Sequence, residues 1–183
     1  MTAAAFDVYV ASHDGHSLRV ATHIMQRLGL GAYDYARLGA TPPVIDPARP
    51  VLLVAPVRYG YHMPEAEAFL TALMAQTPPP PLVFVSVNLT ARKEGRQTIE
   101  TNAYLKKCVD KFKLKPVAAR AVAGVLDYPK YKWLDRQLIR MIMKMSKGPT
   151  GGWEVIEYTD WEDVDAFCDS LPAPFGRMAQ AAE

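Results

Sequence analysis

The chain has 183 residues, 50% of them hydrophobic and 22% charged, and its 21 basic and 19 acidic residues leave a formal net charge of +2. That length and composition predict one globular domain over residues 1–183, and the near balance of charges argues against a chain-wide basic field for nucleic acid. The two cysteines form no CxxC pair, no secretory leader is apparent and no apolar run approaches the roughly 20 residues of a membrane span, so we expect a cytoplasmic protein without disulfides or spanning helices.

Strand and helix patterns alternate along the chain. Residues 6–11 form an apolar run typical of a buried strand, and apolar residues then recur at helical spacing from Leu18 to Leu28. Thr159 and Glu162 stand at the spacing of a capping box and predict the start of the last helix. The remaining predicted strands lie at 32–38, 51–57, 82–88, 117–126 and 153–158, and the remaining helices at 64–76, 98–114 and 159–171.

Five alternations of strand and helix predict an α/β fold. Parallel strands joined by helices need right-handed crossovers, which place helices on both faces of a parallel sheet. In open sheets of this kind a ligand lies beyond the carboxyl ends of the strands, near the point where strand order reverses. The loops after the first, third and fourth predicted strands are therefore the candidate site.

The first of these loops is polar and leads directly into a helix. Hydroxyl groups, a glycine and the free N–H groups of a helix N-terminus suit a phosphate. Asp14 would repel a phosphate unless its side chain turns away, and it could instead cap the helix. The spacing fits a phosphate seat and an ordinary capped helix start equally well, whereas the GxGxxG and Walker patterns are absent. The candidate residues are Ser12, His13, Asp14, Gly15, His16 and Ser17.

The second loop places two tyrosines beside a glycine. Aromatic faces next to a flexible backbone suit stacking on a flat ring, and Arg58 could pair with an anion. A rim of half-buried tyrosines without a ligand would have the same composition. The candidate residues are Pro56, Val57, Arg58, Tyr59, Gly60 and Tyr61.

The third loop is rich in hydrogen-bonding groups. Asn88 and the neighbouring backbone could bind the edge of a heterocycle, although polar residues follow strands in many loops. The candidate residues are Ser86, Val87, Asn88, Leu89 and Thr90. Together the three loops would offer a phosphate seat, aromatic walls and an amide-lined edge, which are the needs of flavin mononucleotide (FMN).

The chain resembles flavodoxin-fold proteins, whose first loop usually reads T-x-T-G-x-T where this chain reads SHDGHS. It resembles one branch more closely, the flavodoxin-like, quinone-linked protoporphyrinogen IX dehydrogenases. The matching stretches span about residues 7–168 and are DGHS, RYGYH, SVNLTARK with TNAY, YPKYKWLDRQLIRMIMKMS and YTDW.

The resemblance implies a five-stranded parallel sheet of order 2-1-3-4-5. It also implies the long-chain type, with an insertion at about 127–152 that splits strand five and residues 153–158 as the second piece of that strand. The sequence itself predicts a tail after about 172. FMN would be the cofactor, with its phosphate on the first loop and its isoalloxazine between the second and third loops.

The resemblance further implies oxidation of protoporphyrinogen IX to protoporphyrin IX in heme biosynthesis, with electrons passing to ubiquinone or menaquinone. The protein would then lie peripherally on the inner membrane, and a homo-oligomer is compatible with the sequence. The flavin carries the redox chemistry in such enzymes. Among the histidines only His62 is placed to act as an acid or base, and we name it as a candidate.

The insertion carries a basic amphipathic pattern with aromatic residues at its start. Such a segment can lie flat on an anionic bilayer, but an ordinary helix with its apolar side on the sheet gives the same pattern. The family's lipid-soluble quinone favours the membrane, and the basic residues could also pair with substrate propionates. The candidate residues are Tyr128, Lys130, Tyr131, Lys132, Trp133, Arg136 and Arg140.

Two rival functions remain open. An NAD(P)H-dependent quinone or flavin reductase would need a place for nicotinamide on the flavin. A non-catalytic electron carrier of the flavodoxin type would be expected to be acidic, and the isoelectric point of about 8.5 argues against it. The histidines show no zinc-ligand spacing, so no metal is expected.

Overall fold

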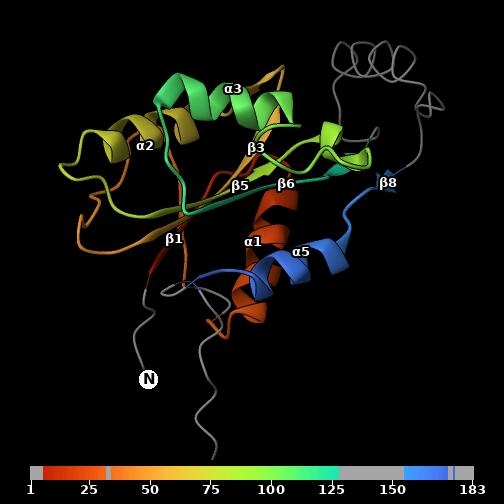
Figure 1. Cartoon of the computed structure of the whole chain (residues 1–183), viewed down its shortest axis with the longest axis horizontal. Coiled ribbons are helices and arrows are strands. Elements are labelled where there is room, and N and C mark those ends of the chain that lie inside the picture. The colour runs from red at the N-terminus through yellow and green to blue at the C-terminus, as the bar shows by residue number, and fades with distance from the viewer. Residues whose placement is uncertain (1–5, 32–33, 128–154, 173–174, 176–183) are drawn as a thin grey trace, which may run out of the picture.

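The computed structural model describes residues 6–31, 34–127, 155–172 and 175, and five parallel strands form its central sheet (Figure 1). Their order is β2-β1-β3-β5-β6, which matches the predicted order 2-1-3-4-5. All neighbouring pairs along this path are parallel. The strands are β1 (Asp7–Val10), β2 (Ala36–Arg37), β3 (Val51–Arg58), β5 (Leu82–Val87) and β6 (Ala118–Val122).

Helices cover both faces of the sheet, as Figure 1 shows. One face is covered by α1 (His16–Arg27) and α5 (Trp161–Asp169), and the other by α2 (Pro64–Met74) and α3 (Ala103–Phe112). Alternate residues of a strand point to opposite faces, so Val8 and Val10 pack with the first helix pair while Tyr9 packs with the second. The central strands β3 and β5 are continuous apolar runs because both of their faces are covered.

A hairpin follows β3 at the site where an irregular loop was predicted. Strand β4 (Tyr61–His62) pairs antiparallel with the end of β3. Tyr59 and Gly60 form the two-residue turn, with φ values of 52° and 83°. Positive φ at both central positions indicates a type I′ turn, whose backbone twist matches the right-handed twist of the paired strands.

The predicted continuation of strand five is wrong in its pairing. Strand β7 (Val125–Asp127) pairs antiparallel with β8 (Val155–Glu157) to form a separate two-stranded sheet. Residues 153–158 therefore do not add a second piece to β6 in the described part of the chain. The tail after 172 is described only at Phe175, whose ring packs against Phe6 with centroids 4.9 Å apart.

Two helix starts differ from the predicted ones. The α5 cap is Asp160, whose carboxylate accepts from the Asp163 N–H at 3.0 Å, so the expected capping box at Thr159 is wrong by one residue. Helix α3 begins at Ala103 rather than near residue 98, because the Asn102 side chain accepts from the Leu105 N–H and caps it there.

The described helices include none that is both long and apolar enough to cross a membrane. The candidate substrate and membrane residues of the insertion lie outside the described residues, and so does the expected helix that carries them. They are Tyr128, Lys130, Tyr131, Lys132, Trp133, Arg136 and Arg140.

Candidate functional site

Three loops meet at the carboxyl edge of the sheet. Strands β1, β3 and β5 are parallel neighbours, so their carboxyl ends lie on one edge. Asp14 Oδ1 of the first loop lies 3.9 Å from Arg58 Nη1 at the end of β3. His62 Nε2 of the hairpin lies 2.9 Å from Ser86 Oγ on β5. The structure therefore brings the three predicted loops together.

The first loop leaves the start of α1 without a side-chain cap in the described chain. The residue at the cap position is Gly15, in the left-handed region with φ 87°, and Ser12 Oγ accepts from its N–H at 3.2 Å. Apart from Gly15 and its two chain neighbours, no heavy atom of the described residues lies within 4 Å of the position that a Gly15 Cβ would take. Asp14 does not cap the helix, which disfavours the ordinary capped start and leaves the first-turn N–H groups available to an anion.

The Asp14 carboxylate is turned toward the Arg58 guanidinium, which lies 3.9 Å away. It also accepts a 2.6 Å hydrogen bond from His13 Nδ1. The Arg58 guanidinium is 5.6 Å from the centroid of the Tyr59 ring. The charge of Arg58 offsets the repulsion that Asp14 would otherwise exert on a phosphate in this loop.

His16 points away from the loop and into the protein. Its Nε2 lies 2.9 Å from Thr159 Oγ1, and that hydroxyl donates its hydrogen to the Ala123 carbonyl at 2.9 Å. The hydroxyl can then only accept from His16, which assigns the proton to Nε2. Burial lowers the pKa of His16 and so favours its neutral form. The imidazole thus holds the first loop against the segment at Thr159. Only the backbone of His16 remains for the predicted phosphate contact. Ser17, the last candidate of this loop, is buried in the first turn of α1.

The hairpin presents two aromatic rings to solvent. The side chains of Tyr59 and Tyr61 are 63% and 55% exposed, which is unusual for rings of this size. Lys107 of α3 places its Nζ 3.5 Å from the centroid of the Tyr61 ring. Pro56 and Val57 belong to β3, and Val57 pairs with His62. The rings are therefore held on a short, firmly paired structure rather than on a loose loop.

The third loop directs its amide inward. Asn88 is 4% exposed, and its Nδ2 donates to Ser86 Oγ at 3.1 Å. Asn102 Nδ2 in turn donates to Asn88 Oδ1 at 3.0 Å and to the Arg96 carbonyl at 2.9 Å. The amide of Asn88 is thus used inside the protein, and its backbone is what remains for a ligand. Val87 ends β5, and Leu89 and Thr90 open the short helix η1 (Leu89–Arg92).

His62 belongs to the same buried network of hydrogen-bonded side chains. It is 4% exposed, its Nε2 contacts Ser86 Oγ, and its ring centroid lies 5.2 Å from that of Phe84. Burial lowers the pKa of His62 to about 4. The bond to Ser86 gives this enclosed imidazole a structural part, and the acid–base part that the sequence suggested for His62 stays a prediction.

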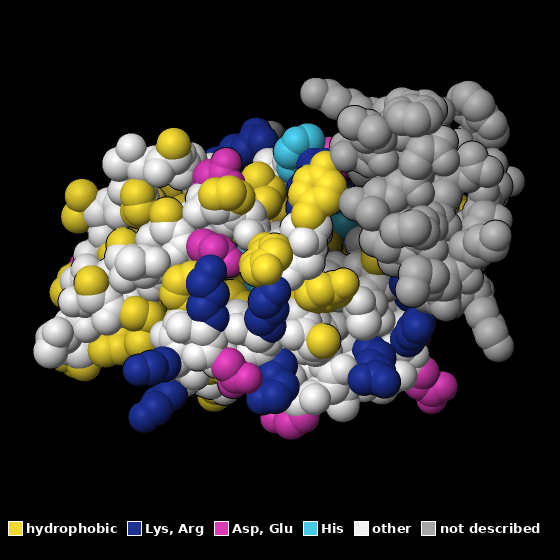
Figure 2. All heavy atoms as spheres, turned by 90° about the horizontal axis from the view of Figure 1, so that it is seen from above, with side chains coloured by type: hydrophobic (Ala, Val, Ile, Leu, Met, Phe, Trp, Pro, Cys, Tyr) yellow, Lys and Arg dark blue, Asp and Glu magenta, His cyan; other side chains and the backbone are white. Residues whose placement is uncertain are grey.

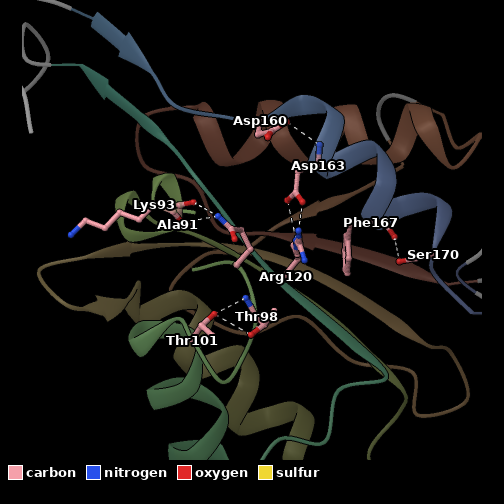
Figure 3. A network of polar contacts seen from close by, with 10 residues as sticks. Ala91, Lys93, Thr98, Thr101, Arg120, Asp160, Asp163, Phe167 and Ser170 are labelled. Carbon is pink, nitrogen blue, oxygen red and sulfur yellow. Dashed lines mark hydrogen bonds and ion pairs between the residues drawn. The ribbon is translucent and has the colours of Figure 1, made fainter. Parts of the chain in front are cut away.

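A second polar network holds the segment that follows the third loop (Figure 3). Gln97 Nε2 donates to the carbonyl groups of Ala91 and Lys93, at 2.8 and 2.9 Å. Arg120 of β6 forms an ion pair with Asp163 of α5, beside the Asp160 cap. The Gln97 contacts hold η1, and the ion pair joins β6 to α5. The Ala121 N–H donates to the Gln97 carbonyl at 2.8 Å and so joins this segment to β6.

Sequence reasoning missed Asn102, Thr159 and Lys107 as residues that shape the site. The cap spacing from Asn102 to Leu105 was a usable signal, but it lay inside a segment that had been assigned to helix. Thr159 and Lys107 act across the fold, so no local pattern marks them. The described residues contain no group of three or more His, Cys, Asp or Glu that could hold a metal ion. Burial raises the pKa of both Cys108 and Cys168 to about 12, which keeps the two thiols protonated.

Comparison with known proteins defines the class. The flavodoxin domain family matches residues 8–151, most of the chain. The chain therefore belongs to the flavodoxin domain family, and this membership supports a flavin as its cofactor. Within that class it is similar to two proteins that share one name.

Protoporphyrinogen IX dehydrogenase (quinone) of Escherichia coli (strain K12) is 33% identical to this chain over 168 residues, which covers 90% of this chain and 92% of the relative. The protein of the same name from Leishmania major is 37% identical over 123 residues, which covers 67% of this chain and 53% of the relative. The first similarity extends over nearly the full length of both proteins.

Proposed function

We propose that the chain binds FMN and uses it to oxidise protoporphyrinogen IX to protoporphyrin IX in heme biosynthesis, with a membrane quinone as the electron acceptor. The observation that carries this proposal is the 33% identity to a protoporphyrinogen IX dehydrogenase (quinone) over 90% of the chain. A match confined to the three candidate loops would support only a flavin-binding fold, whereas this one covers 90% of the chain and 92% of the relative.

The residues of the first loop fit the phosphate of FMN. The N-terminus of α1 has no side-chain cap within the described residues, and Gly15 lets the backbone approach an anion closely. In our proposal the phosphate accepts from the first-turn N–H groups and from the hydroxyls of Ser12 and Ser17. Arg58 balances the charge of Asp14 beside it.

The isoalloxazine would lie between the hairpin and the third loop. Tyr59 and Tyr61 offer exposed rings on one side, and the backbone from Ser86 to Thr90 offers hydrogen-bonding groups on the other. When bound there, FMN would supply two-electron redox chemistry between the porphyrinogen and the quinone. The protein's own part is to hold the isoalloxazine and the porphyrinogen in place and to limit the access of water to them. We assign no side chain as an acid or base.

An anaerobic assay tests the function. Protein loaded with FMN would be mixed with protoporphyrinogen IX and a soluble quinone, and porphyrin fluorescence would be followed with time. We expect fluorescence to grow only when protein, FMN and quinone are all present. NAD(P)H with quinone, but without porphyrinogen, is the matched control for a reductase. Rapid oxidation of NAD(P)H together with no porphyrin formation would overturn the proposal.

We also propose that the basic stretch at 130–140 meets an anionic membrane surface, because it gathers Lys130, Lys132, Arg136 and Arg140 beside three aromatic residues. Sedimentation with vesicles checks this. We expect binding to vesicles that contain phosphatidylglycerol, weak binding to neutral ones, and loss of binding when the four cations are replaced by Gln. Equal binding of the wild type to both vesicles would contradict the proposal.

A further inference from the structure

Lys107 connects helix α3 to the hairpin of the candidate site. Its Nζ lies 3.5 Å from the centroid of the Tyr61 ring and 3.5 Å from the Gly60 carbonyl oxygen. Both contacts are on the hairpin that in our proposal flanks the flavin. A cation is thus seated beside one of the two exposed tyrosines, although it comes from a helix on the face of the sheet.

The contacts of Lys107 differ from those of its lysine neighbours on α3. Lys106 donates to Asp110 at 2.9 Å and Lys111 donates to Glu67 at 2.7 Å, so each of these has a carboxylate partner. Among the ion pairs of the described residues, none joins Lys107 to a carboxylate. Lysine and arginine side chains cross the face seen in Figure 2, which looks onto the α2 and α3 side of the molecule.

A π face and a carbonyl dipole orient an ammonium group without cancelling its charge. The group has three N–H donors, and the Gly60 carbonyl takes one of them at most. Lys107 is also exposed, so the remaining donors can reach a ligand from solvent. The charge on Lys107 is therefore oriented by the hairpin and still available to an anion.

We infer that Lys107, seated on Tyr61, binds a carboxylate of the substrate at the flavin site. This inference rests on the proposed function, because a porphyrinogen carries propionate carboxylates at the rim of a broad apolar macrocycle. The macrocycle would lie against the flavin beside the hairpin, and a propionate would reach the ammonium group at the edge of the same hairpin. One charge-assisted hydrogen bond is then gained by the acid and lost by its ester.

The test compares protoporphyrinogen IX with its dimethyl ester, in which both carboxylates are blocked. Four proteins would be assayed with FMN bound: wild type, Lys107→Gln, Lys107→Arg and the matched control Lys106→Gln. We expect Lys107→Gln to raise KM for the free acid on the order of tenfold with little change in kcat, and to leave KM for the ester unchanged. Lys107→Arg should restore most of the loss, and Lys106→Gln should behave as wild type. The Kd for FMN should be the same in all four.

The outcomes distinguish a failure of this inference from a failure of the proposed function. Equal effects of Lys107→Gln on acid and ester, or a weakened affinity for FMN, would show a structural part and overturn the inference. A wild type that oxidises acid and ester with equal KM would keep the function and overturn the inference. If the wild type oxidises neither, binding of protoporphyrin IX and its dimethyl ester decides: a preference for the diacid that Lys107→Gln removes would keep Lys107 as the carboxylate contact, and the absence of any preference would overturn it.

Discussion

The first and third loops of the site contain similar residue types and use them in opposite ways. In the first loop the helix start is left without a side-chain cap in the described structure, and His13 and Asp14 are exposed. In the third loop Ser86 and Asn88 are buried and bound to His62 and to Asn102. The first loop leaves the N–H groups of the helix start without a side-chain partner among the described residues, whereas the third loop uses its polar side chains to hold the protein together.

A polar residue after a strand therefore marks the edge of the sheet but not the direction of its side chain. A buried polar group is costly unless it is hydrogen-bonded, so the hydrogen-bonded network of His62, Ser86, Asn88 and Asn102 should act mainly on stability. The first loop should act mainly on affinity for the cofactor. Four measurements test this division between stability and cofactor affinity.

The largest effect is expected for Asn102→Ala. The change removes the cap of α3 and leaves the Asn88 amide without its partner in the interior. We expect the free energy of unfolding to fall by roughly 3 kcal/mol, measured by urea denaturation. Asp160→Ala is the matched control, because the Asp160 cap of α5 is exposed whereas Asn102 is buried, and it should cost about 1 kcal/mol. Equal losses of unfolding free energy in the two variants would mean that the buried hydrogen-bonded network adds no stability beyond that of a helix cap.

The pH dependence of stability tests His62. Burial lowers its pKa to about 4 in the folded protein, against an ordinary value of 6.5 for histidine, so the unfolded state binds the proton more tightly. Stability should therefore be full above pH 6.5, fall as the pH drops toward 4, and level off below that. The difference corresponds to roughly 3 kcal/mol.

His62→Gln separates this group from the other titrating residues, since glutamine can still donate to Ser86 but does not titrate. Between pH 7 and pH 4 the wild type should lose roughly 3 kcal/mol more than the variant in the free energy of unfolding. Parallel losses would show that His62 is not responsible.

Gly15→Ala should act on the cofactor. A Cβ at Gly15 meets no described atom within 4 Å, but φ 87° is unfavourable for alanine and the loop must shift. We expect the Kd for FMN to rise about tenfold, which corresponds to about 1.4 kcal/mol, measured by quenching of flavin fluorescence. Gly95→Ala is the control, because Gly95 also has a positive φ of 72° and open space around it. A similar rise in that variant would attribute the effect to general strain.

The smallest effect is expected for His13→Ala. The pair of His13 and Asp14 is exposed, and exposed pairs contribute little to stability. The free energy of unfolding should change by less than about 0.5 kcal/mol and the Kd for FMN by less than about twofold. A larger change in Kd would mean that His13 itself contacts the phosphate, and the first loop would then depend on side chains more than its backbone geometry indicates.

The sheet was predictable because long apolar runs leave few alternatives for β3 and β5, and because alternating strands and helices restrict the topology. The hairpin was not, since Tyr59 is an unusual residue for a position with φ 52°. The start of α5 was missed because Thr159 and Asp160 are both good caps, and only the folded chain shows that Thr159 is engaged with His16.

The position of the three loops was likewise predictable, but the direction of their side chains was not. Burial of Asn88 depends on Asn102, which lies 14 residues further along the chain. The cation–π contact of Lys107 with Tyr61 depends on the packing of α3 beside the hairpin. Such contacts are set by tertiary packing and leave no trace in local spacing.

The bond between His16 and Thr159 joins residues that are 143 positions apart. Helix α1 is tied to the same late segment by Arg19 with Glu157 and by His23 with Asp165, at separations of 138 and 142 positions. During synthesis the first loop is made well before the segment at 157–165, so it lacks these supports until α5 has left the ribosome. The geometry of the first loop is therefore completed only after most of the sheet has been made.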